Sequence, residues 1–522
     1  MDALVNPGSL LQALAPELLM IAGAMVLLLA TVWRPQGNER GSAEGAERTG
    51  VIARFSTLLC VVVSVVVIIM WGDAAPGTPD LRIAGDGFRW AIDLIILAGT
   101  GLSLTLLEGD HERSGAFSPE TPILMVLGAA GMMVLAAARD LMFIFLGIEL
   151  MSLAVYVLAG VNRRSARGAE AAIKYFLLGA FSTGFLLYGM ALVFGATGST
   201  RLVDINTWVM AHAALSPMLR VGLGLLLAGF AFKLALAPFH FWTPDVYDGA
   251  PLPVTAFMSA VVKTAAFAAF ARVMTEALPG AVAAWHPVLW WLSVLTMIVG
   301  NMLALSQRNL VRLLAYSSIA HAGYLLVAIV VSSNTGTAAL VFYAVSYTLA
   351  TMGAFGVLIT VNGGRDRSPT IEDLAGLWLV RPGLAIAMAV FLLAFLGMPL
   401  AGGMGFFAKW YLLQSALQAS MPQTVLAVVL ALSSAVAAAY YLAVIAAMFM
   451  RRRPDGQAVP SGAPLVGVLI AGSAVALLVL GVYPTPMARL ARRAIPSHTV
   501  QPPRPDSVRS PAVPLTTATL AR

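Results

Sequence analysis

Lysine is rare in this chain of 522 residues, and it occurs only within or at the edge of apolar segments. Arginine supplies the remaining 28 of the 32 basic side chains. A lysine that leaves water changes its proton affinity readily, whereas an arginine cannot be deprotonated in a protein. The pattern therefore predicts arginines at water-facing positions and titratable lysines inside the apolar segments. The four lysines are Lys174, Lys233, Lys263 and Lys409.

A carboxylate and an imidazole also occur in the middle of apolar runs. Glu149 lies near the centre of the run 140–160, with Ser152 on the same helical face. His321 lies midway along the run 309–331. Ionisable groups at membrane depth are costly, and they mark paths for protons or ions. A structural role, bonded to a neighbouring helix, is the alternative for both side chains.

Three further ionisable residues have plainer explanations. Glu170 precedes Lys174 by one helical turn, so a surface ion pair competes with a role for Lys174 in proton transfer. Glu17 and Asp93 lie near the ends of their apolar runs. We expect both of these carboxylates to be structural.

The buried ionisable groups together predict proton translocation. A carboxylate beside a lysine favours the protonated amine, while removal from water favours the neutral amine. A change of charge at one group therefore alters the proton affinity of the next. We expect the relay to use Glu149, Lys174, Lys233, Lys263, His321 and Lys409.

Composition excludes several other chemistries. Cys60 is the only cysteine, so the chain cannot build a disulfide framework, an iron–sulfur cluster or a thiolate metal site. The phosphate-binding pattern GxxxxGK followed by Ser or Thr does not occur. The net charge of +7 is scattered between apolar runs, which favours arginines at a membrane surface over a nucleic-acid interface. We expect no cofactor and no metal in this chain.

The elements that must position these groups are membrane-spanning helices. Apolar residues make up 59% of the chain and charged residues 11%, against about 25% charged in soluble domains. The mean hydropathy is +0.85. The sequence thus predicts an all-α polytopic membrane protein with about fourteen helices. Their windows are 10–33, 51–71, 87–107, 119–137, 140–160, 168–194, 216–238, 251–275, 285–306, 309–331, 336–361, 382–418, 423–450 and 463–485.

Prolines and glycines interrupt two of these windows. Pro238 falls at the end of the seventh window, and Pro399 with several glycines falls in the middle of the twelfth. Interrupted helices in corresponding positions of two halves indicate a transport site. Their separation by five helices predicts two inverted repeats, formed by helices 4–8 and 9–13. The expected parts are 1–118 (three helices), 119–275 and 285–450 (the repeats), 463–485 (helix 14) and 486–522 (a disordered Arg/Pro-rich tail).

Arginines in the connecting loops predict the orientation. They concentrate in alternate loops, notably at 163–167 and 451–453. Because basic residues favour the cytoplasmic side, the N-terminus is expected outside.

Six stretches carry a resemblance to a known family. The chain resembles the antiporter-like membrane subunits of proton-pumping NADH:quinone oxidoreductase, respiratory complex I, a family that also includes Mrp-type antiporter subunits. The stretches lie in order within residues 140–415. They are FIFLGIELMSLAVYVLAG, EAAIKYFLLGAFSTGFLLYG, FKLALAPFHFWTPDVYDGAP, VTAFMSAVVKTAAFAAFAR, QRNLVRLLAYSSIAHAGYLL and LLAFLGMPLAGGMGFFAKWYL.

The resemblance implies a fold, a site and partners. It implies fourteen helices with broken helices 7 and 12, and functional positions at Glu149, Lys174, Lys233, Lys263 and Lys409. Lysine at the last position distinguishes the chain from the M-type branch, which usually has glutamate there. The L-type branch has a long lateral helix that this chain lacks, so the chain is most similar to the N-type branch.

The same resemblance implies that electron transfer takes place in partner subunits and not in this chain. FMN, iron–sulfur clusters and quinone are expected in partner subunits, among them M-type, L-type and small membrane subunits. The expected location is the bacterial inner (plasma) membrane. Two alternatives remain, namely a subunit of an Mrp-type Na⁺/H⁺ antiporter and a passive membrane scaffold.

Overall fold

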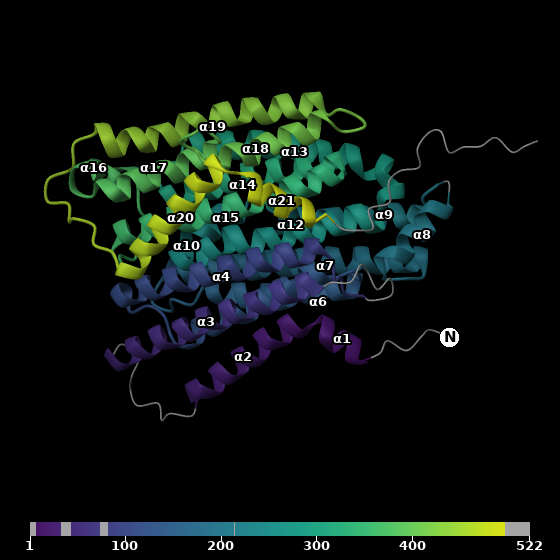
Figure 1. The fold of residues 1–522 in the computed structure, drawn as a ribbon, viewed down its shortest axis with the longest axis horizontal. Helices are drawn as coiled ribbons and strands as arrows, with labels where there is room; N and C mark the ends of the chain where they lie inside the picture. The colour runs from purple at the N-terminus through teal and green to yellow at the C-terminus, as the bar shows by residue number, and fades with distance from the viewer. Residues whose placement is uncertain (1–6, 33–42, 74–81, 213, 496–522) are drawn as a thin grey trace, which may run out of the picture.

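A computed structural model of the chain describes residues 7–32, 43–73, 82–212 and 214–495. These residues are almost entirely helical, and most of the long helices run side by side (Figure 1). The elements are α1 (Pro7–Ala13), α2 (Ala15–Val32), α3 (Ala43–Asp73), α4 (Gly87–Ser114), α5 (Glu120–Ala137), α6 (Leu141–Ala159), α7 (Ala166–Thr197), α8 (Leu202–Ala211), α9 (Pro217–Lys233), α10 (Thr243–Gly249), α11 (Leu252–Phe257), η1 (Met258–Val262), α12 (Lys263–Arg272), η2 (Val273–Ala277), η3 (Pro279–Ala281), α13 (Val282–Leu305), α14 (Leu310–Val331), α15 (Asn334–Asn362), η4 (Ile371–Leu374), α16 (Leu377–Val380), α17 (Pro382–Leu396), α18 (Met404–Leu417), α19 (Thr424–Met450), α20 (Pro464–Val482) and α21 (Thr485–Arg493).

The long helices confirm a multi-pass membrane protein. Among the described residues, 12 helical segments are long and apolar enough to cross a membrane, and each coincides with a predicted window. The two remaining windows, 216–238 and 382–418, hold the shorter helices α9, α17 and α18. Both interruptions that the sequence predicts are therefore present as breaks in helical structure.

The break near Pro238 lies between α9 and α10 and has its own hydrogen-bond partners. The hydroxyl of Thr296 accepts the backbone N–H of Ala237 at 3.0 Å. The indole of Trp242 donates to the carbonyl of Phe232 at 3.1 Å. Such partners are required because unwound backbone at membrane depth is tolerated only where protein or water satisfies it.

The break at Pro399 separates α17 from α18 and depends on close approach of the two half-helices. Leu400 and Gly403 have positive φ angles of 62° and 52°. A Cβ atom added to Gly405 would lie 2.1 Å from the carbonyl oxygen of Ala394 on the opposite half-helix. Only glycine allows α18 to start this close to α17.

Two clusters of ion pairs define opposite ends of the bundle. At one, which we call the Asp86 end, Arg272 binds Asp86 at 2.8 Å and Arg139 binds Glu276 at 2.8 Å. At the other, the Asp248 end, the side chain of Asp248 accepts hydrogen bonds from Asn309 and Ser368. The helix α11–η2 starts beside the Asp248 cluster and finishes at the Asp86 cluster.

A similar β-bridge contact occurs at each end of the helix bundle. Asp140 caps α6 and forms a bridge with Arg201, which follows α7. Asn309 caps α14 and forms a bridge with Thr370, which follows α15. The first bridge joins residues beside the Asp86 cluster, and the second joins residues beside Asp248. Two matching turns therefore lie at opposite ends of the bundle.

The second bridge is stabilised by a short ionic loop. Burial raises the pKa of Asp373, but hydrogen bonds from Arg367 and from the N–H and hydroxyl of Thr370 outweigh burial and lower that pKa to about 2. The carboxylate is thus ionised over the working pH range, and it holds the chain after α15 closed.

The structure corrects two predictions. Arginine is not confined to water-facing positions, because Arg89 and Arg272 are buried, each beside carboxylates that neutralise it. The tail predicted as disordered from residue 486 begins as helix α21, whose residues Met487 and Ala491 are buried. Residues 496–522 lie outside the described part of the chain.

Replacing Gly405 with alanine should destabilise the broken helix. The new Cβ would overlap a backbone oxygen, and overpacking of this kind costs about 1–3 kcal/mol. The matched control is Gly467→Ala in α20, where nothing lies within 4 Å, so the helix should gain up to about 1 kcal/mol. Thermal unfolding in detergent measures both, and equal stability of the two variants would contradict the close approach.

Candidate functional site

The first group of predicted site residues lies where α6 meets the end of α9. Lys233, the last residue of α9, donates a hydrogen bond of 2.5 Å to the hydroxyl of Ser152. Its ammonium also lies 5.6 Å from the centre of the Tyr156 ring. Glu149, one turn before Ser152, is close enough to interact electrostatically with this ammonium. Glu149 thus lies on the same side of α6 as the Ser152 hydroxyl that binds Lys233, and the described residues show no ion pair between Glu149 and Lys233.

Lys263 is buried in the bundle, and its ammonium has hydrogen bonds to a single residue among those described, Ser318. Its ammonium donates to the carbonyl of Ser318 at 2.6 Å and also to the Ser318 hydroxyl. The side chain is only 4% exposed, and no ion pair to it occurs in the described residues. The π-helical turn η1 ends directly before Lys263, and such turns often occur at functional sites.

Besides Ser318, which binds Lys263, helix α14 carries a series of hydroxyl and imidazole groups that contact tyrosines of other helices. Ser317, beside Ser318, shares a hydrogen bond with the hydroxyl of Tyr441 from α19. His321, one turn further, lies between two tyrosines, with Nδ1 2.5 Å from Tyr343 and Nε2 3.3 Å from Tyr441. Each contact joins groups that can both donate and accept a proton.

Lys409 lies at the far side of this series, beside the break between α17 and α18. Its ammonium donates to the carbonyl of Leu396 at 3.0 Å and to the hydroxyl of Ser434 at 2.9 Å. Leu396 is the last residue of α17, so the carbonyl that binds Lys409 lies at a helix end, where intrahelical partners are missing. The ammonium also faces the Tyr324 ring at 4.6 Å, and that ring lies 5.4 Å from the imidazole of His321.

Two small cavities adjoin the central residues. The lining of one includes Ser259, Ser317 and Thr351 among apolar side chains, and the lining of the other includes His321. Tyr347 lines both cavities, each of which has room for about one water molecule. Most of the accessible lining is apolar, so a water there would have few hydrogen-bond partners.

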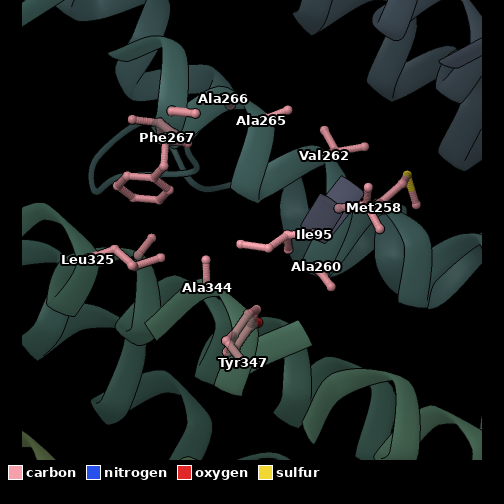
Figure 2. Close-up of a cluster of buried hydrophobic side chains, with 14 of the residues drawn as sticks. Ile95, Met258, Ala260, Val262, Ala265, Ala266, Phe267, Leu325, Ala344 and Tyr347 are labelled. Carbon is pink, nitrogen blue, oxygen red and sulfur yellow. The ribbon is translucent and has the colours of Figure 1, made fainter. Parts of the chain in front are cut away.

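Apolar packing surrounds the same region. Figure 2 shows side chains of η1 and α12, among them Met258 and Phe267, against Ile95 from α4 and Leu325 from α14. Lys263 belongs to this central helix, so its ammonium is enclosed by side chains that offer no counter-charge. The polar contacts described above are therefore confined to a narrow row.

Aromatic rings occupy the space between the Lys233 group and the central group. Tyr156 and Tyr175 meet edge to face at 4.8 Å, and Tyr175 stacks on Trp242 at 4.6 Å. Trp242 in turn contacts Tyr247, which lines the cavity beside Ser317. The described residues show no direct hydrogen bond from Lys233 to Lys263, and this aromatic row lies along the gap.

Lys174 lies apart from the other lysines. It pairs with Glu170 at 2.7 Å and with Asp245 at 3.1 Å, and its side chain is 40% exposed. Asp245 also binds Arg312 at the start of α14. The surface pair that competes with proton transfer in the sequence interpretation is thus present, enlarged by Asp245 and Arg312.

The sequence interpretation did not identify several polar contacts of the row. They come from different helices, and nothing in their spacing relates them to the lysines. One signal was available, because Tyr440 and Tyr441 are adjacent in an otherwise apolar window. The contacts concerned are Ser318, Tyr343, Ser434 and Tyr441.

The row contains no grouping suited to a metal. In the described ranges, no three or more His, Cys, Asp or Glu side chains gather in a way that could hold a metal ion. The arrangement offers amines, hydroxyls and an imidazole, which are groups that pass protons.

Comparison with known proteins places these features in a wider group. Residues 138–434 match the family model described as NADH:quinone oxidoreductase/Mrp antiporter, TM. A curated relative from Gemmatimonas aurantiaca, NADH-quinone oxidoreductase subunit N, is 72% identical over 94% of each chain. A protein of the same name from Trichlorobacter lovleyi is 42% identical, covering 93% of this chain and 97% of its own.

Solved structures show the same fold. A chain of respiratory complex I from Thermus thermophilus is 37% identical with a TM-score of 0.76, covering 91% of this chain and 99% of its own. A chain of the Mrp complex from Dietzia is 20% identical with a TM-score of 0.75, covering 92% and 97%. The second likeness concerns the fold alone.

Replacing Lys263 with methionine should stabilise the folded chain. Methionine removes a buried amine that has no counter-charge, and burial of a poorly compensated polar group costs about 1–3 kcal/mol. Lys174→Met is the control, because an exposed pair contributes at most about 1 kcal/mol. Thermal unfolding in detergent tests this, and a less stable Lys263→Met variant would show that the amine is structural.

Proposed function

This chain belongs to the NADH-quinone oxidoreductase subunit N family, within the NADH:quinone oxidoreductase/Mrp antiporter group, and we propose that it moves protons across the membrane for that complex. In this proposal, quinone reduction in partner subunits drives proton transfer along the row of buried groups. The chain itself contributes proton-binding side chains and no redox centre.

One observation carries the proposal, namely that buried proton-passing groups lie along α14 from Lys263 to Lys409, joined in part by hydrogen bonds and in part by ring contacts. Ser318 contacts Lys263, His321 lies between Tyr343 and Tyr441, and Lys409 lies beside the next ring along α14. Every one of these groups is buried, so a proton that leaves one of them passes to a neighbour more easily than to bulk water. Helix α14 carries the contacts of both lysines, and it thereby joins the two halves of the chain.

The residues have distinct roles in this relay. Glu149 lies one turn before the Ser152 that binds Lys233, and in the proposal a change of charge at one of the two ionisable groups alters proton binding at the other. Among the described residues, Lys263 and Lys409 have no carboxylate partner, so a positive charge on either lysine is costly to keep and is readily transferred as a proton. His321 transfers the proton between them through its tyrosine partners. Lys174 serves as a peripheral group at the Asp248 end.

The matching turns support two inverted repeats as the frame of the relay. Asp140 and Asn309 begin equivalent helices, and the bridges that they form lie at opposite ends of the bundle. We assign 119–275 and 285–450 to the repeats, which follow the three helices of 1–118. Residues 463–485 form the fourteenth helix.

Loop charges support an orientation in the bacterial plasma membrane. Arg167 binds Asp248, and Arg453 lies beside Gly376 next to the loop of Asp373, so the arginine-rich loops gather at one end. The Asp248 end therefore faces the cytoplasm, and the N-terminus lies outside.

Partner subunits supply the electron chemistry. FMN, iron–sulfur clusters and quinone belong to them in this proposal, together with neighbouring M-type, L-type and small membrane subunits. The rival assignment, a subunit of an Mrp-type Na⁺/H⁺ antiporter, shares the fold. The names of the relatives at 72% and 42% identity favour the oxidoreductase.

Replacing Lys233 or Lys263 with methionine should reduce proton pumping by about tenfold or more, since proton transfer by a positioned group contributes at least that much. Pumping and quinone reduction are measured on the assembled complex in proteoliposomes. Ser103→Ala is the control, because Ser103 is buried in α4 and its hydroxyl contacts only Gly99 and Met352, which do not belong to the row. Full pumping by an assembled Lys263→Met complex would refute the relay.

The subunits that co-purify with this chain distinguish the oxidoreductase assignment from the antiporter assignment. After gentle solubilisation, a native-gel band that oxidises NADH should contain this chain together with flavin and iron–sulfur subunits. Proton movement should persist when choline replaces sodium. Migration with small membrane subunits alone, together with sodium-dependent proton flux, would favour the antiporter.

A further inference from the structure

A second group of buried charges lies outside the proposed relay, where Arg89 at the start of α4 reaches Glu17 of α2. The Arg89 side chain has no exposed surface, and its Nη2 donates to both oxygens of Glu17 at 2.7 and 2.9 Å. Its Nε donates to one oxygen of Asp93 at 3.3 Å. Both carboxylates are buried, Glu17 at 1% and Asp93 at 0% exposure.

The neighbouring ion cluster is electrically balanced. Arg272 and Arg139 carry two positive charges, and Asp86 and Glu276 carry two negative ones. The Arg272 guanidinium holds the pKa of Asp86 at about 2 against the opposing effect of burial, so this carboxylate stays ionised. The net charge of this cluster is therefore zero, so the cluster does not neutralise an extra negative charge in the Arg89 group.

The Arg89 group is not balanced. One guanidinium faces two buried carboxylates, so full ionisation would leave a net negative charge without a partner away from water. An uncompensated buried charge costs several kcal/mol, and a carboxyl in that position binds a proton instead. A proton on one of the two carboxyls makes the group neutral.

The hydrogen bonds indicate which carboxyl holds the proton. Glu17 receives two short bonds from the guanidinium, as an ionised carboxylate does. Asp93 receives one long bond, and its second oxygen, Oδ1, is buried with no hydrogen-bond partner in the described residues. The indole nitrogen of Trp90, one turn away, is also buried and unpartnered.

We propose that Asp93 is a proton-binding site of the N-terminal helices, in which Arg89 and Glu17 form the ion pair and Asp93 carries the proton. The charged groups that face it are Arg89 on its own helix, Glu17 from α2 and Arg272 from α12. Its ligand is a proton, and the competing ligand for the same charge deficit is a monovalent cation such as sodium.

The site is separate from the lysine row. Ile95, two residues beyond Asp93, belongs to the apolar cluster that α4 forms with η1, α12, α14 and α15 (Figure 2). In the described residues, no hydrogen bond or ion pair joins Arg89, Glu17 or Asp93 to a residue of the lysine row. The proton of Asp93 instead belongs to the junction of α2 and α4, so its binding sets how firmly α2 is held.

The test compares the pH dependence of stability in the assembled complex. Wild type, Asp93→Asn and Glu17→Gln are purified, and release of this chain on heating is followed between pH 6 and pH 9. Each series is repeated with choline in place of sodium. Asparagine imitates a protonated aspartate, so Asp93→Asn should assemble normally.

The expected result follows from linkage. A carboxyl protonated in the folded chain and ionised after release loses stabilisation as pH rises, so release of the wild type should increase, relative to Asp93→Asn, by up to about tenfold per pH unit. In Glu17→Gln, Asp93 becomes the only counter-ion of Arg89 and ionises, so this pH-dependent excess should disappear.

Three results would overturn the proposal. They are parallel pH curves for wild type and Asp93→Asn, failure of Asp93→Asn to assemble, and wild-type stability that responds to sodium but not to pH. The last would assign the charge deficit to a bound cation. None of these measurements depends on proton pumping, so the proposed relay stands or falls separately.

Discussion

Removal of water from polar groups is the constraint on which this structure depends. In the apolar interior every charge and every free backbone group needs a partner supplied by the protein. The helix breaks leave backbone groups without intrahelical partners, and nearby side chains supply the missing hydrogen bonds. The end of α17 leaves the Leu396 carbonyl without an intrahelical partner, and Lys409 binds it. At the other break, Thr296 and Trp242 bind backbone groups that the helix leaves free.

The same constraint separates two kinds of buried cation. Arg272 is paired with Asp86 and Glu276, and Arg89 with Glu17 and Asp93, so each guanidinium has acidic partners at close range that tie helices together. Lys263 and Lys409 are bound only by hydroxyls and carbonyls. Because neutral partners compensate a buried charge incompletely, these lysines are the cations that the proposed relay uses, whereas an arginine keeps its charge. The arginines and the lysines of the proposed relay thus differ in partners as well as in residue type.

Much of this arrangement could be predicted from the sequence. Apolar windows predicted the helices, and Pro238 and Pro399 predicted the two breaks because proline removes a backbone donor. Where the prediction failed, partners distant in the sequence were responsible. Arg89 and Arg272 are buried because Glu17 and Asp86 come from other parts of the chain. Spacing along one helix cannot reveal a partner on another.

By itself the sequence determined the all-helical membrane fold and the rare buried lysines, since hydropathy and proline act locally. The tertiary structure alone decided which groups meet. It placed Ser318 and Tyr441 between Lys263 and Lys409, and it left Lys174 in a half-exposed ion cluster. The physical reason is that proton transfer depends on contacts of a few ångströms between helices, and packing rather than sequence spacing sets those distances.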